Sequence, residues 1–293
     1  MSKKKILITG ANGQLGKALR QLEAFYPEWA FVFLSREDLR IHHFELVRNF
    51  FRTIQPAFCI NCAAYTAVDK AEEEEELAYL VNAESVGVLA AICREHHTKF
   101  IHISTDYVFD GNARLPYQTD SPTNPQTIYG ASKLQGERQA LEYNPDSIII
   151  RTSWVYSEYG KNFVKTMLKL MQEKNEISVV NDQVGSPTYA VDLAATLLTI
   201  VKRCDADAVN CPSGVYHFCN EGMISWYDFA LAIKAYTGST CTINPIPSSA
   251  FPTAARRPHY SVLDCTSLQV TFGVTLKNWK ESLEHCLDKI KNP

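Results

Sequence analysis

Short apolar runs alternate with longer amphipathic segments through the first half of the chain. Five runs rich in β-branched and other apolar residues are typical of buried strands: residues 6–9, 31–34, 57–61, 100–104 and 147–151. Apolar residues recur at helical spacing between several of these runs, over residues 16–25, 77–96 and 129–143. Nearly continuous apolar strands separated by helices predict a parallel sheet that helices cover on both faces. We therefore expect an α/β fold with a Rossmann-type doubly wound parallel sheet.

The pattern changes after residue 151. The sequence predicts further helices over residues 163–173, 191–202 and 226–236, and short strands over residues 177–180 and 214–220. Pro and Ser gather over residues 245–258, which we interpret as a loop over a surface cleft. We place a first domain at residues 1–155, completed by a later segment near 214–237. Residues 156–293 then form a smaller, discontinuous α/β C-terminal domain.

The composition is that of an ordinary globular chain. Hydrophobic residues make up 46% and charged residues 21%, and the net charge is −3, so neither disorder nor a basic nucleic-acid surface has support. No uninterrupted apolar stretch approaches the ~18 residues of a membrane-spanning helix, and the basic N-terminus lacks the ~7–15 apolar residues of a signal core. The nine scattered cysteines predict free thiols. We expect a cytoplasmic protein with no membrane or nucleic-acid partner.

A glycine pattern lies directly after the first predicted strand. Residues 10–16 have the spacing G-x-x-G-x-x-G, a variant of the dinucleotide-binding fingerprint. Glycines are needed because side chains would block the tight turn, the pyrophosphate and the contact between helix and strand. The amides at the N-terminus of the following helix then bind the phosphate charge. We assign cofactor contacts to all seven residues: Gly10, Ala11, Asn12, Gly13, Gln14, Leu15 and Gly16.

The end of the second predicted strand bears on the choice of cofactor. An acid is expected there to bond the adenosine ribose hydroxyl, but the chain has Ser35 followed by Arg36. A guanidinium suits a 2′-phosphate, so we favour NADPH over NADH. The alternative is that Arg36 stacks on adenine or faces water, in which case either cofactor would serve. Asp38 and Leu39 complete this predicted stretch of cofactor contacts.

Tyr129 and Lys133 form a Y-x-x-x-K pattern at the start of a predicted helix. Residues four apart share a helix face, so we expect the Lys133 ammonium beside the phenol. A neighbouring cation, helped by oxidised nicotinamide, should favour the phenolate and move the phenol pKa from about 10 toward the working range. Thr105 ends the fourth predicted strand, where doubly wound sheets place ligands. We predict that Tyr129 shuttles a proton and that Thr105 bonds a carbonyl oxygen.

These features resemble the extended short-chain dehydrogenase/reductases and, more narrowly, the dTDP-4-dehydrorhamnose reductase family. The similarity is nearly end to end and includes six further motifs: residues 63–72 (AAYTAVDKAE), 104–109 (STDYVF), 151–156 (RTSWVY), 162–163 (NF), 181–188 (NDQVGSPT) and 251–258 (FPTAARRP). The resemblance implies hydride transfer from the nicotinamide to the C4 ketone of dTDP-4-dehydro-L-rhamnose. That is the last step of dTDP-L-rhamnose synthesis for cell-surface polysaccharide. The smaller domain would bind this substrate.

The resemblance also implies a role for each matching residue. Tyr129 donates the proton to the forming alkoxide, Lys133 tunes Tyr129 and holds the nicotinamide ribose, and Thr105 bonds the oxygen at C4. Asp106, next to Thr105, contacts the sugar. Further cofactor contacts follow the third strand, at Ala63, Ala64 and Tyr65.

Trp154 and Arg257 complete the expected substrate site. Trp154 directly follows the fifth predicted strand, and we interpret it as a wall against the sugar rather than as core. Arg256 and Arg257 lie in a proline-flanked loop, and a guanidinium suits a sugar-nucleotide diphosphate, for which we favour Arg257. For Asn82, a structural and a functional role remain equally open.

The resemblance also bears on metal binding and assembly. Some relatives pair through Mg²⁺ held by glutamates, where this chain has Ala18 and Val191. Apolar side chains cannot supply the oxygen ligands that Mg²⁺ requires, so Mg²⁺ is doubtful and we predict no metal site. We accordingly favour a monomer over a metal-bridged homodimer.

Two other functions compete with the reductase. A related sugar-nucleotide enzyme is one, although a dehydratase would carry an acidic pair where this chain has Asp106 and Tyr107. An epimerase would need no net turnover of the cofactor. The other is a non-catalytic regulatory subunit, which would tolerate loss of Tyr129 or Lys133, whereas both are present.

Overall fold

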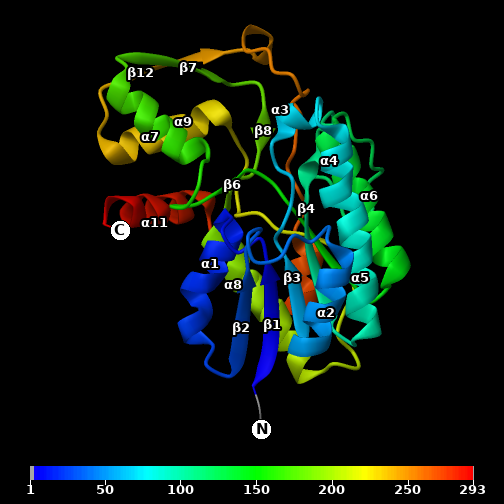
Figure 1. Ribbon diagram of the computed structural model, residues 1–293. Coiled ribbons are helices and arrows are strands. Elements are labelled where there is room, and N and C mark those ends of the chain that lie inside the picture. The colour runs from blue at the N-terminus through cyan, green and yellow to red at the C-terminus, as the bar shows by residue number, and fades with distance from the viewer. Residues whose placement is uncertain (1–2, 293) are drawn as a thin grey trace.

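A six-stranded parallel sheet forms the centre of the molecule in the computed structural model, which describes residues 3–292 (Figure 1). The strands lie in the order β10-β5-β4-β3-β1-β2. Their bounds are β1 Lys4–Thr9, β2 Trp29–Leu34, β3 Phe58–Asn61, β4 Lys99–Thr105, β5 Ile148–Thr152 and β10 Gly214–His217. The chain turns from β1 to β2 on one side and returns to β3 on the other, which puts a topological switch point between β1 and β3. The predicted Rossmann-type sheet is confirmed.

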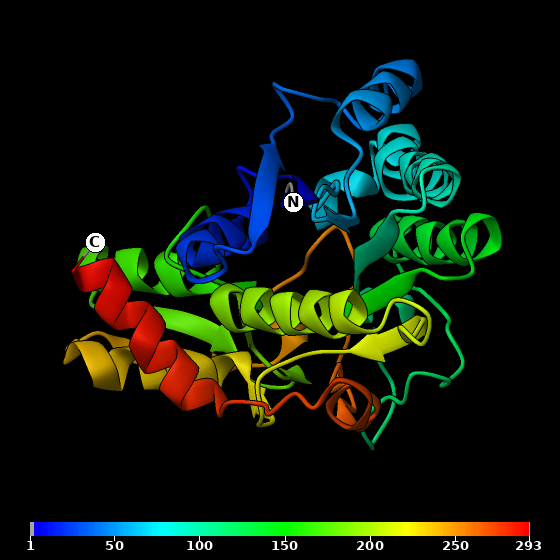
Figure 2. The same cartoon turned by 90° about the horizontal axis from the view of Figure 1, so that it is seen from below.

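Helices cover both faces of the sheet (Figure 2). One face carries α1 Gln14–Leu22, α8 Ala190–Ala206 and α10 Thr266–Phe272. The other face carries α2 Phe44–Ile54, α5 Ser85–Glu95 and α6 Ile128–Tyr143. In β1, Ile6 and Ile8 pack under the first layer and Leu7 packs under the second, all fully buried. Side chains alternate along a strand, so a sheet covered on both faces needs an unbroken apolar run.

The predicted helix at 77–96 is divided into consecutive pieces. After α3 (Val68–Ala71), the chain forms α4 (Glu75–Tyr79), a π-helical turn (η2, Leu80–Glu84) and then α5. By length and composition alone, Glu75–Glu95 could cross a membrane, although polar residues at 82, 84 and 85 interrupt its apolar run, so it is not the uninterrupted stretch that the sequence analysis looked for. Its pieces α4, η2 and α5 all pack against α6, as parts of a helical layer do.

A second group of elements, which we call the small lobe, lies above the carboxyl ends of the strands in Figure 1. It consists of α7 Phe163–Glu173, β7 Glu176–Val180, α9 Trp226–Thr237, β12 Thr242–Ile246 and α11 Trp279–Lys291. Tyr156, Phe229 and Leu283 are buried in its core. The segment expected near 214–237 to complete the first domain is therefore split, because β10 joins the sheet and α9 packs in the small lobe.

Short elements complete the fold. Two lie within the sheet layer: η1 Glu23–Phe25 between α1 and β2, and η3 Asp106–Val108 after β4. The others lie in the later part of the chain: β6 Val155–Tyr156, β8 Val184–Gly185, β9 Thr188–Tyr189, β11 Ile224–Ser225 and η4 Ser248–Ala250. β6 pairs with β9, and β8 pairs with β11. The predicted loop at 245–258 begins later than expected, since β12 runs to Ile246. Pro245 is tolerated there because β12 pairs with β7 alone and has a free edge.

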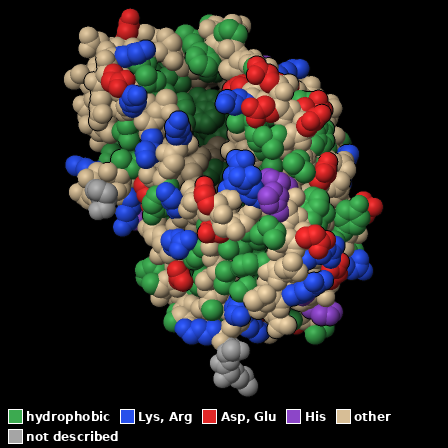
Figure 3. Space-filling model, viewed as in Figure 1, with side chains coloured by type: hydrophobic (Ala, Val, Ile, Leu, Met, Phe, Trp, Pro, Cys, Tyr) green, Lys and Arg blue, Asp and Glu red, His purple; other side chains and the backbone are tan. Residues whose placement is uncertain are grey.

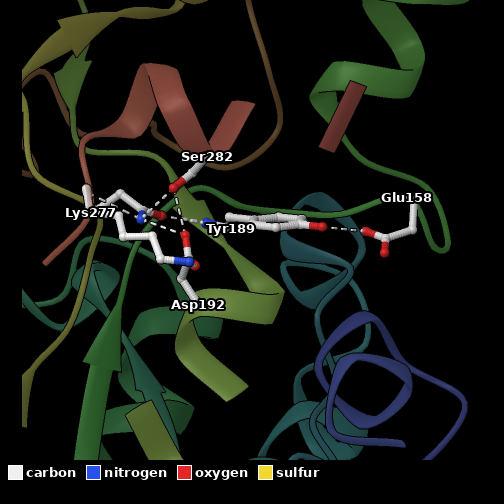
Figure 4. A network of polar contacts seen from close by, with 6 residues as sticks. Glu158, Tyr189, Asp192, Lys277 and Ser282 are labelled. Atoms are coloured by element: carbon white, nitrogen blue, oxygen red, sulfur yellow. Dashed lines mark hydrogen bonds and ion pairs between the residues drawn. The ribbon is translucent and has the colours of Figure 1, made fainter. Parts of the chain in front are cut away.

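A buried carboxylate joins the two parts of the molecule (Figure 4). Asp192, in the first turn of α8, accepts hydrogen bonds from Asn220 Nδ2 at 2.9 Å, Lys277 Nζ at 2.8 Å and the Ser282 hydroxyl. Asn220 Oδ1 also accepts from the Tyr189 amide at 2.7 Å. A buried charge is tolerated only when its oxygens are satisfied, and here three donors satisfy it. The network fixes α11 of the small lobe against α8 of the sheet layer.

One pair of cysteines departs from the prediction of free thiols. Cys204 in the last turn of α8 and Cys211 before β10 form a disulfide, with Cα atoms 4.6 Å apart. The prediction is wrong for this pair because the chain turns back on itself between helix and strand. The remaining seven cysteines are free.

Candidate active site

A cleft of about 750 Å³ lies at the carboxyl ends of the central strands, between the sheet and the small lobe. Figure 3 shows the surface hollowed at this place. All the site residues predicted from the sequence line the cleft except Ala11, Asp38 and Arg257. The structure therefore brings together predicted residues that are spread from residue 10 to residue 154.

The glycine loop forms one end of the cleft. Gly10 has a φ of +67°, and a Cβ there would lie 2.7 Å from the Ala63 amide nitrogen. A Cβ on Gly16 would lie 2.5 Å from the Gly10 carbonyl oxygen. Gly13 caps α1 without a side-chain hydrogen bond, so the first amides of the helix are available to an anion. Ala11 is buried beneath this loop. The loop thus fits a dinucleotide pyrophosphate.

The turn after β2 forms the edge of the cleft next to the glycine loop. Ser35 Oγ accepts from the amides of Glu37 and Asp38, and Asp38 Oδ2 accepts from the Ser35 amide at 2.8 Å. Asp38 therefore shapes the turn and faces away from the cleft. Arg36 is exposed and lines the cleft, as does Glu37, which accepts from Asn12 Nδ2 at 3.3 Å. The sequence analysis missed Glu37, an acid displaced by a few positions from the strand end.

Asn82 holds the predicted cofactor loop that follows β3. Its side chain is fully buried in the π-helical turn. It accepts from the Tyr65 amide at 2.8 Å and donates to the Tyr65 carbonyl at 3.0 Å and to Ser132 Oγ at 3.1 Å. Because Ser132 lies on α6, Asn82 fixes the loop against the helix that carries Tyr129. The role left open by the sequence is one of positioning.

Tyr129 lies in the first turn of α6, next to the end of β4. Thr127 Oγ1 caps the helix by accepting from the Gly130 amide at 3.0 Å. Burial raises the pKa of the Tyr129 phenol above its ordinary value, and the neighbouring Thr105 hydroxyl acts in the opposite direction. In the cofactor-free protein, burial has the largest effect and keeps the phenol protonated, and the lowering expected from Lys133 with oxidised nicotinamide stays a prediction.

Lys133 is almost completely buried, one turn after Tyr129. Its Nζ donates to the Ile103 carbonyl at 2.6 Å and lies 3.2 Å from His102 Nε2. Burial lowers the pKa of Lys133 to about 8, although Glu137 and Cys62 favour its charged form. The sequence analysis missed His102, which no local motif connects to Lys133.

Two carboxyl groups lie close to the catalytic candidates. Asp106 accepts from the Thr105 hydroxyl at 3.0 Å, while its Oδ2 is buried without a partner among the described residues. Burial raises the pKa of Asp106 to about 6. Glu137 on α6 makes a buried ion pair with Arg151 on β5, with an N–O distance of 2.7 Å, and accepts from the Ser104 hydroxyl. This second carboxylate anchors α6 to the sheet beneath the cleft.

Trp154 lines the cleft in a strained backbone conformation. Its φ is +49°, which costs a non-glycine residue of the order of 1–3 kcal/mol. The indole stacks on Trp226 of α9, with ring centroids 3.5 Å apart and an angle of 9° between the planes. The small lobe therefore determines where this aromatic wall stands.

Arg257 lies beside the cleft without lining it. Its guanidinium pairs with Asp69 on α3 and donates to the Tyr107 hydroxyl at 3.2 Å. Asp69 also accepts from the Ala255 amide at 3.1 Å, so it holds the loop as well as the side chain. Arg256 is exposed.

The whole chain matches one family. The model described as the RmlD substrate binding domain matches residues 4–292. A dTDP-4-dehydrorhamnose reductase from Aggregatibacter actinomycetemcomitans is 40% identical over 287 residues, which cover 96% of this chain and 97% of the relative. The chain belongs to the dTDP-4-dehydrorhamnose reductase family.

Solved structures of family members agree closely with this fold. A dTDP-4-dehydrorhamnose reductase from Clostridium acetobutylicum is 42% identical with a TM-score of 0.92, covering 98% of this chain and 99% of that one. The enzyme from Bacillus anthracis, solved in complex with NADP, is 38% identical with a TM-score of 0.93, covering 98% of this chain and 100% of that one. The family and the cradle at Gly10 and Gly16 together indicate a nicotinamide cofactor.

The positions relevant to a bridging metal lie in apolar surroundings. Ala18 is fully buried in the core between α1 and α8, and Val191 packs partly buried against the same core. Among residues 3–292, no group of three or more His, Cys, Asp or Glu side chains is placed to hold a metal ion. The absence of Mg²⁺ stays a prediction, which chelation can test.

Proposed function

We propose that this protein reduces the C4 ketone of dTDP-4-dehydro-L-rhamnose to dTDP-L-rhamnose with NADPH, in the cytoplasm, as the last step in the supply of this sugar for cell-surface polysaccharide. The observation that carries the proposal is one cleft lined by Thr105, Tyr129 and Lys133 together with the glycine loop, in a chain of the reductase family. The bound nicotinamide supplies a hydride to C4, and a proton completes the alcohol.

Tyr129 donates that proton to the ketone oxygen. Its raised pKa means that the phenol is protonated at neutral pH, which is the form that reduction requires. Thr105, at the end of β4, bonds the same oxygen. Lys133, charged below about pH 8, stabilises the phenolate left behind until the solvent returns a proton. Hydride and proton together convert the ketone to the alcohol with no further reactant.

The substrate lies between the sheet and the small lobe. Trp154 forms a wall against the sugar, Asp106 bonds the sugar beside Thr105, and Arg257 binds the diphosphate. A diphosphate would compete with Asp69 for the Arg257 guanidinium, since both are anions of suitable geometry. Residues 1–155 with β10 hold the cofactor and present Thr105, Asp106 and Trp154 to the sugar, and the later segments complete the substrate site with Arg257.

NADPH is the preferred cofactor in this proposal. Arg36 is exposed at the edge of the cleft, where its guanidinium suits a 2′-phosphate. The Bacillus anthracis relative bound to NADP supports the same choice. NADH remains the alternative if Arg36 only stacks on adenine.

The test compares Tyr129→Phe with the wild-type protein, using the loss of reduced-nicotinamide absorbance with dTDP-4-dehydro-L-rhamnose. Removing a general acid lowers the rate by ~10²–10⁴-fold. Tyr143→Phe is the matched control, because Tyr143 ends the same helix and is 44% exposed. We expect the control to keep its full rate. Equal rates for Tyr129→Phe and the wild type would overturn the assignment of Tyr129.

A further inference from the structure

A line of buried polar side chains runs from Lys133 across the carboxyl ends of β4, β3 and β1, beneath the cleft. His102 Nε2 lies 3.2 Å from Lys133 Nζ, and His102 Nδ1 lies 3.0 Å from Asn61 Nδ2. Asn61 Oδ1 lies 2.6 Å from the Thr9 hydroxyl and 3.3 Å from the Ala63 amide nitrogen. Thr9, Asn61 and His102 are register partners on the neighbouring strands β1, β3 and β4, and each is at most 3% exposed.

Burying polar groups so deeply costs free energy of folding unless they are hydrogen-bonded. We therefore asked what these polar side chains do. An all-apolar face would be simpler, and the neighbours on the same face are indeed apolar: Leu7 on β1, Cys59 on β3 and Phe100 on β4. The polar substitutions occur only at the carboxyl ends of the strands, where Lys133 approaches. Thr9 also accepts from the Ala63 amide at 3.3 Å, so the line holds the loop after β3 as well as this lysine.

A count of protons determines how the line is arranged. A neutral imidazole carries one N–H and offers one acceptor. Burial, and secondly the Lys133 charge, lowers the pKa of His102 well below its ordinary value, so the ring is neutral. If the ammonium of Lys133 donates to Nε2, the ring proton is on Nδ1. The structure places Asn61 Nδ2 at Nδ1, but the two ends of an amide have nearly the same shape, so this tautomer requires the amide to be turned over. Its oxygen then accepts from Nδ1 and its NH₂ group is directed to Thr9, while the Ala63 amide donates to the Thr9 hydroxyl oxygen, 3.3 Å away.

We propose that His102 is a positioning residue, which holds Lys133 through a neutral imidazole protonated on Nδ1 and is itself fixed by Asn61 and Thr9. The inference rests on the proposed function, in which Lys133 acts on Tyr129 and on the cofactor. It adds a residue from outside the Tyr129–Lys133 motif.

The arrangement directs Lys133 toward the cleft. The ammonium has three N–H groups, of which the Ile103 carbonyl and His102 take two. The third remains for the cleft, which Lys133 lines. The titratable groups around Lys133 are Tyr129 and Glu137 on α6, Cys62 after β3 and His102 on β4. Of these, His102 alone offers a neutral acceptor at hydrogen-bond distance.

Removing this acceptor should make the charged form of Lys133 less stable. A hydrogen bond to a charged group is strong enough to shift a pKa by about one unit or more. We therefore expect His102→Leu to move the titration of Lys133 from about 8 to about 7. His102→Gln keeps an amide oxygen that can accept from Nζ, so its titration should remain close to that of the wild type.

The measurement is NMR of ¹⁵N-lysine- and ¹⁵N-histidine-labelled protein over a pH series, which needs no substrate. The wild type should show His102 neutral with the proton on Nδ1 from pH 5 to 8. Phe100→Leu is the matched control, because it changes the same face of the same strand and should leave the Lys133 titration unmoved. A charged His102, a proton on Nε2, or an unchanged Lys133 titration in folded His102→Leu overturns the proposal.

The proposal can be tested even if His102→Leu does not fold. The tautomer of His102 in the wild type and the Lys133 titration in His102→Gln then serve as the tests, because a large shift of the Lys133 pKa in His102→Gln contradicts the proposal. The ketone-reduction assay is run on the same wild-type sample. If the protein shows the expected tautomer but does not reduce the ketone, only the proposed function is contradicted. If the protein reduces the ketone at full rate but His102 has the other tautomer, only this inference is contradicted.

Discussion

At the scale of single residues, Asp106 combines deep burial with an unpartnered carboxylate oxygen. Burial raises the pKa of Asp106 from 3.8 to about 6. The protonated carboxyl therefore stabilises the folded protein fully below about pH 4, and this contribution is lost as the pH rises through about 6. Asp106→Asn should therefore stabilise the protein at pH 7.5, by up to ~3 kcal/mol, and change little near pH 4. Urea unfolding at the two pH values measures this. A destabilised variant at pH 7.5 would show that the carboxylate is well solvated.

We expect Arg36 and Glu37, at the edge of the cleft, to decide the cofactor preference. Arg36→Ala should raise the KM for NADPH at least ~10-fold, because a charge-assisted hydrogen bond to the 2′-phosphate is lost, and leave that for NADH nearly unchanged. Glu37→Gln is the complementary variant and should lower the KM for NADPH, since an anion beside the 2′-phosphate is removed. Initial rates with both cofactors test the pair. Equal losses for NADPH and NADH in Arg36→Ala would place the guanidinium on adenine or on the loop.

Functional residues can be found from the sequence when they lie close together along the chain. Tyr129 and Lys133 share one helix turn, and the glycine loop is continuous, so their patterns are visible in the sequence. His102 meets Lys133 across 31 positions, and Asn82 meets Ser132 across 50. Such contacts depend on how α6 lies against the sheet, which no local pattern specifies. The burial that raises the pKa of Tyr129 in the cofactor-free protein likewise depends on the tertiary structure and is not visible in the Y-x-x-x-K spacing.

At the scale of elements, the prediction is best where one periodicity persists. The helix expected at 163–173 has the bounds of α7. The helix expected at 77–96 contains a π-helical turn, which periodicity cannot distinguish from α-helix over five residues. β12 is hidden by Pro245, which an edge strand tolerates. The pattern does not single out α2, α10 and α11, of which α10 has only seven residues.

The loop held by Asp69 provides a test at this scale. Arg257→Ala should raise the KM for the sugar nucleotide at least ~10-fold, because a guanidinium contact to the diphosphate is lost, with little change in the KM for NADPH. Arg256→Ala is the matched control, since the neighbouring arginine is exposed and should have a small effect. Steady-state kinetics with each substrate varied separate the two constants. A larger effect from Arg256→Ala would reassign the diphosphate contact.

At the scale of the whole molecule, the cleft depends on contacts that join distant segments. Asp192 bonds Ser282 across 90 positions, and Trp226 of the small lobe supports Trp154 after β5. The sequence indicates two parts and a sheet, but the placement of α11 and α9 against them follows from buried partners far along the chain. That is why the sheet and Trp154 can be predicted from the sequence, whereas the stacking of Trp226 on Trp154 cannot.

Assembly and metal dependence are predictions for the intact protein. With Ala18 buried in the core and Val191 packed against it, neither position can present a carboxylate to a bridging Mg²⁺. We expect a monomeric mass by light scattering that is unchanged by EDTA, and activity that survives chelation. A dimer that dissociates with EDTA and re-forms with Mg²⁺ would contradict this. The acidic residues 72–76 would then be the first ligands to examine.

The most direct test of the account follows the hydride itself. The protein is incubated with dTDP-4-dehydro-L-rhamnose and NADPH that carries deuterium at the transferred position of nicotinamide C4, and the sugar product is analysed by NMR and mass spectrometry. The account predicts dTDP-L-rhamnose with one deuterium at C4, formed in equal amount to the oxidised cofactor and greatly slowed in Tyr129→Phe. An unlabelled product, a label at another carbon, or unconsumed cofactor would contradict it.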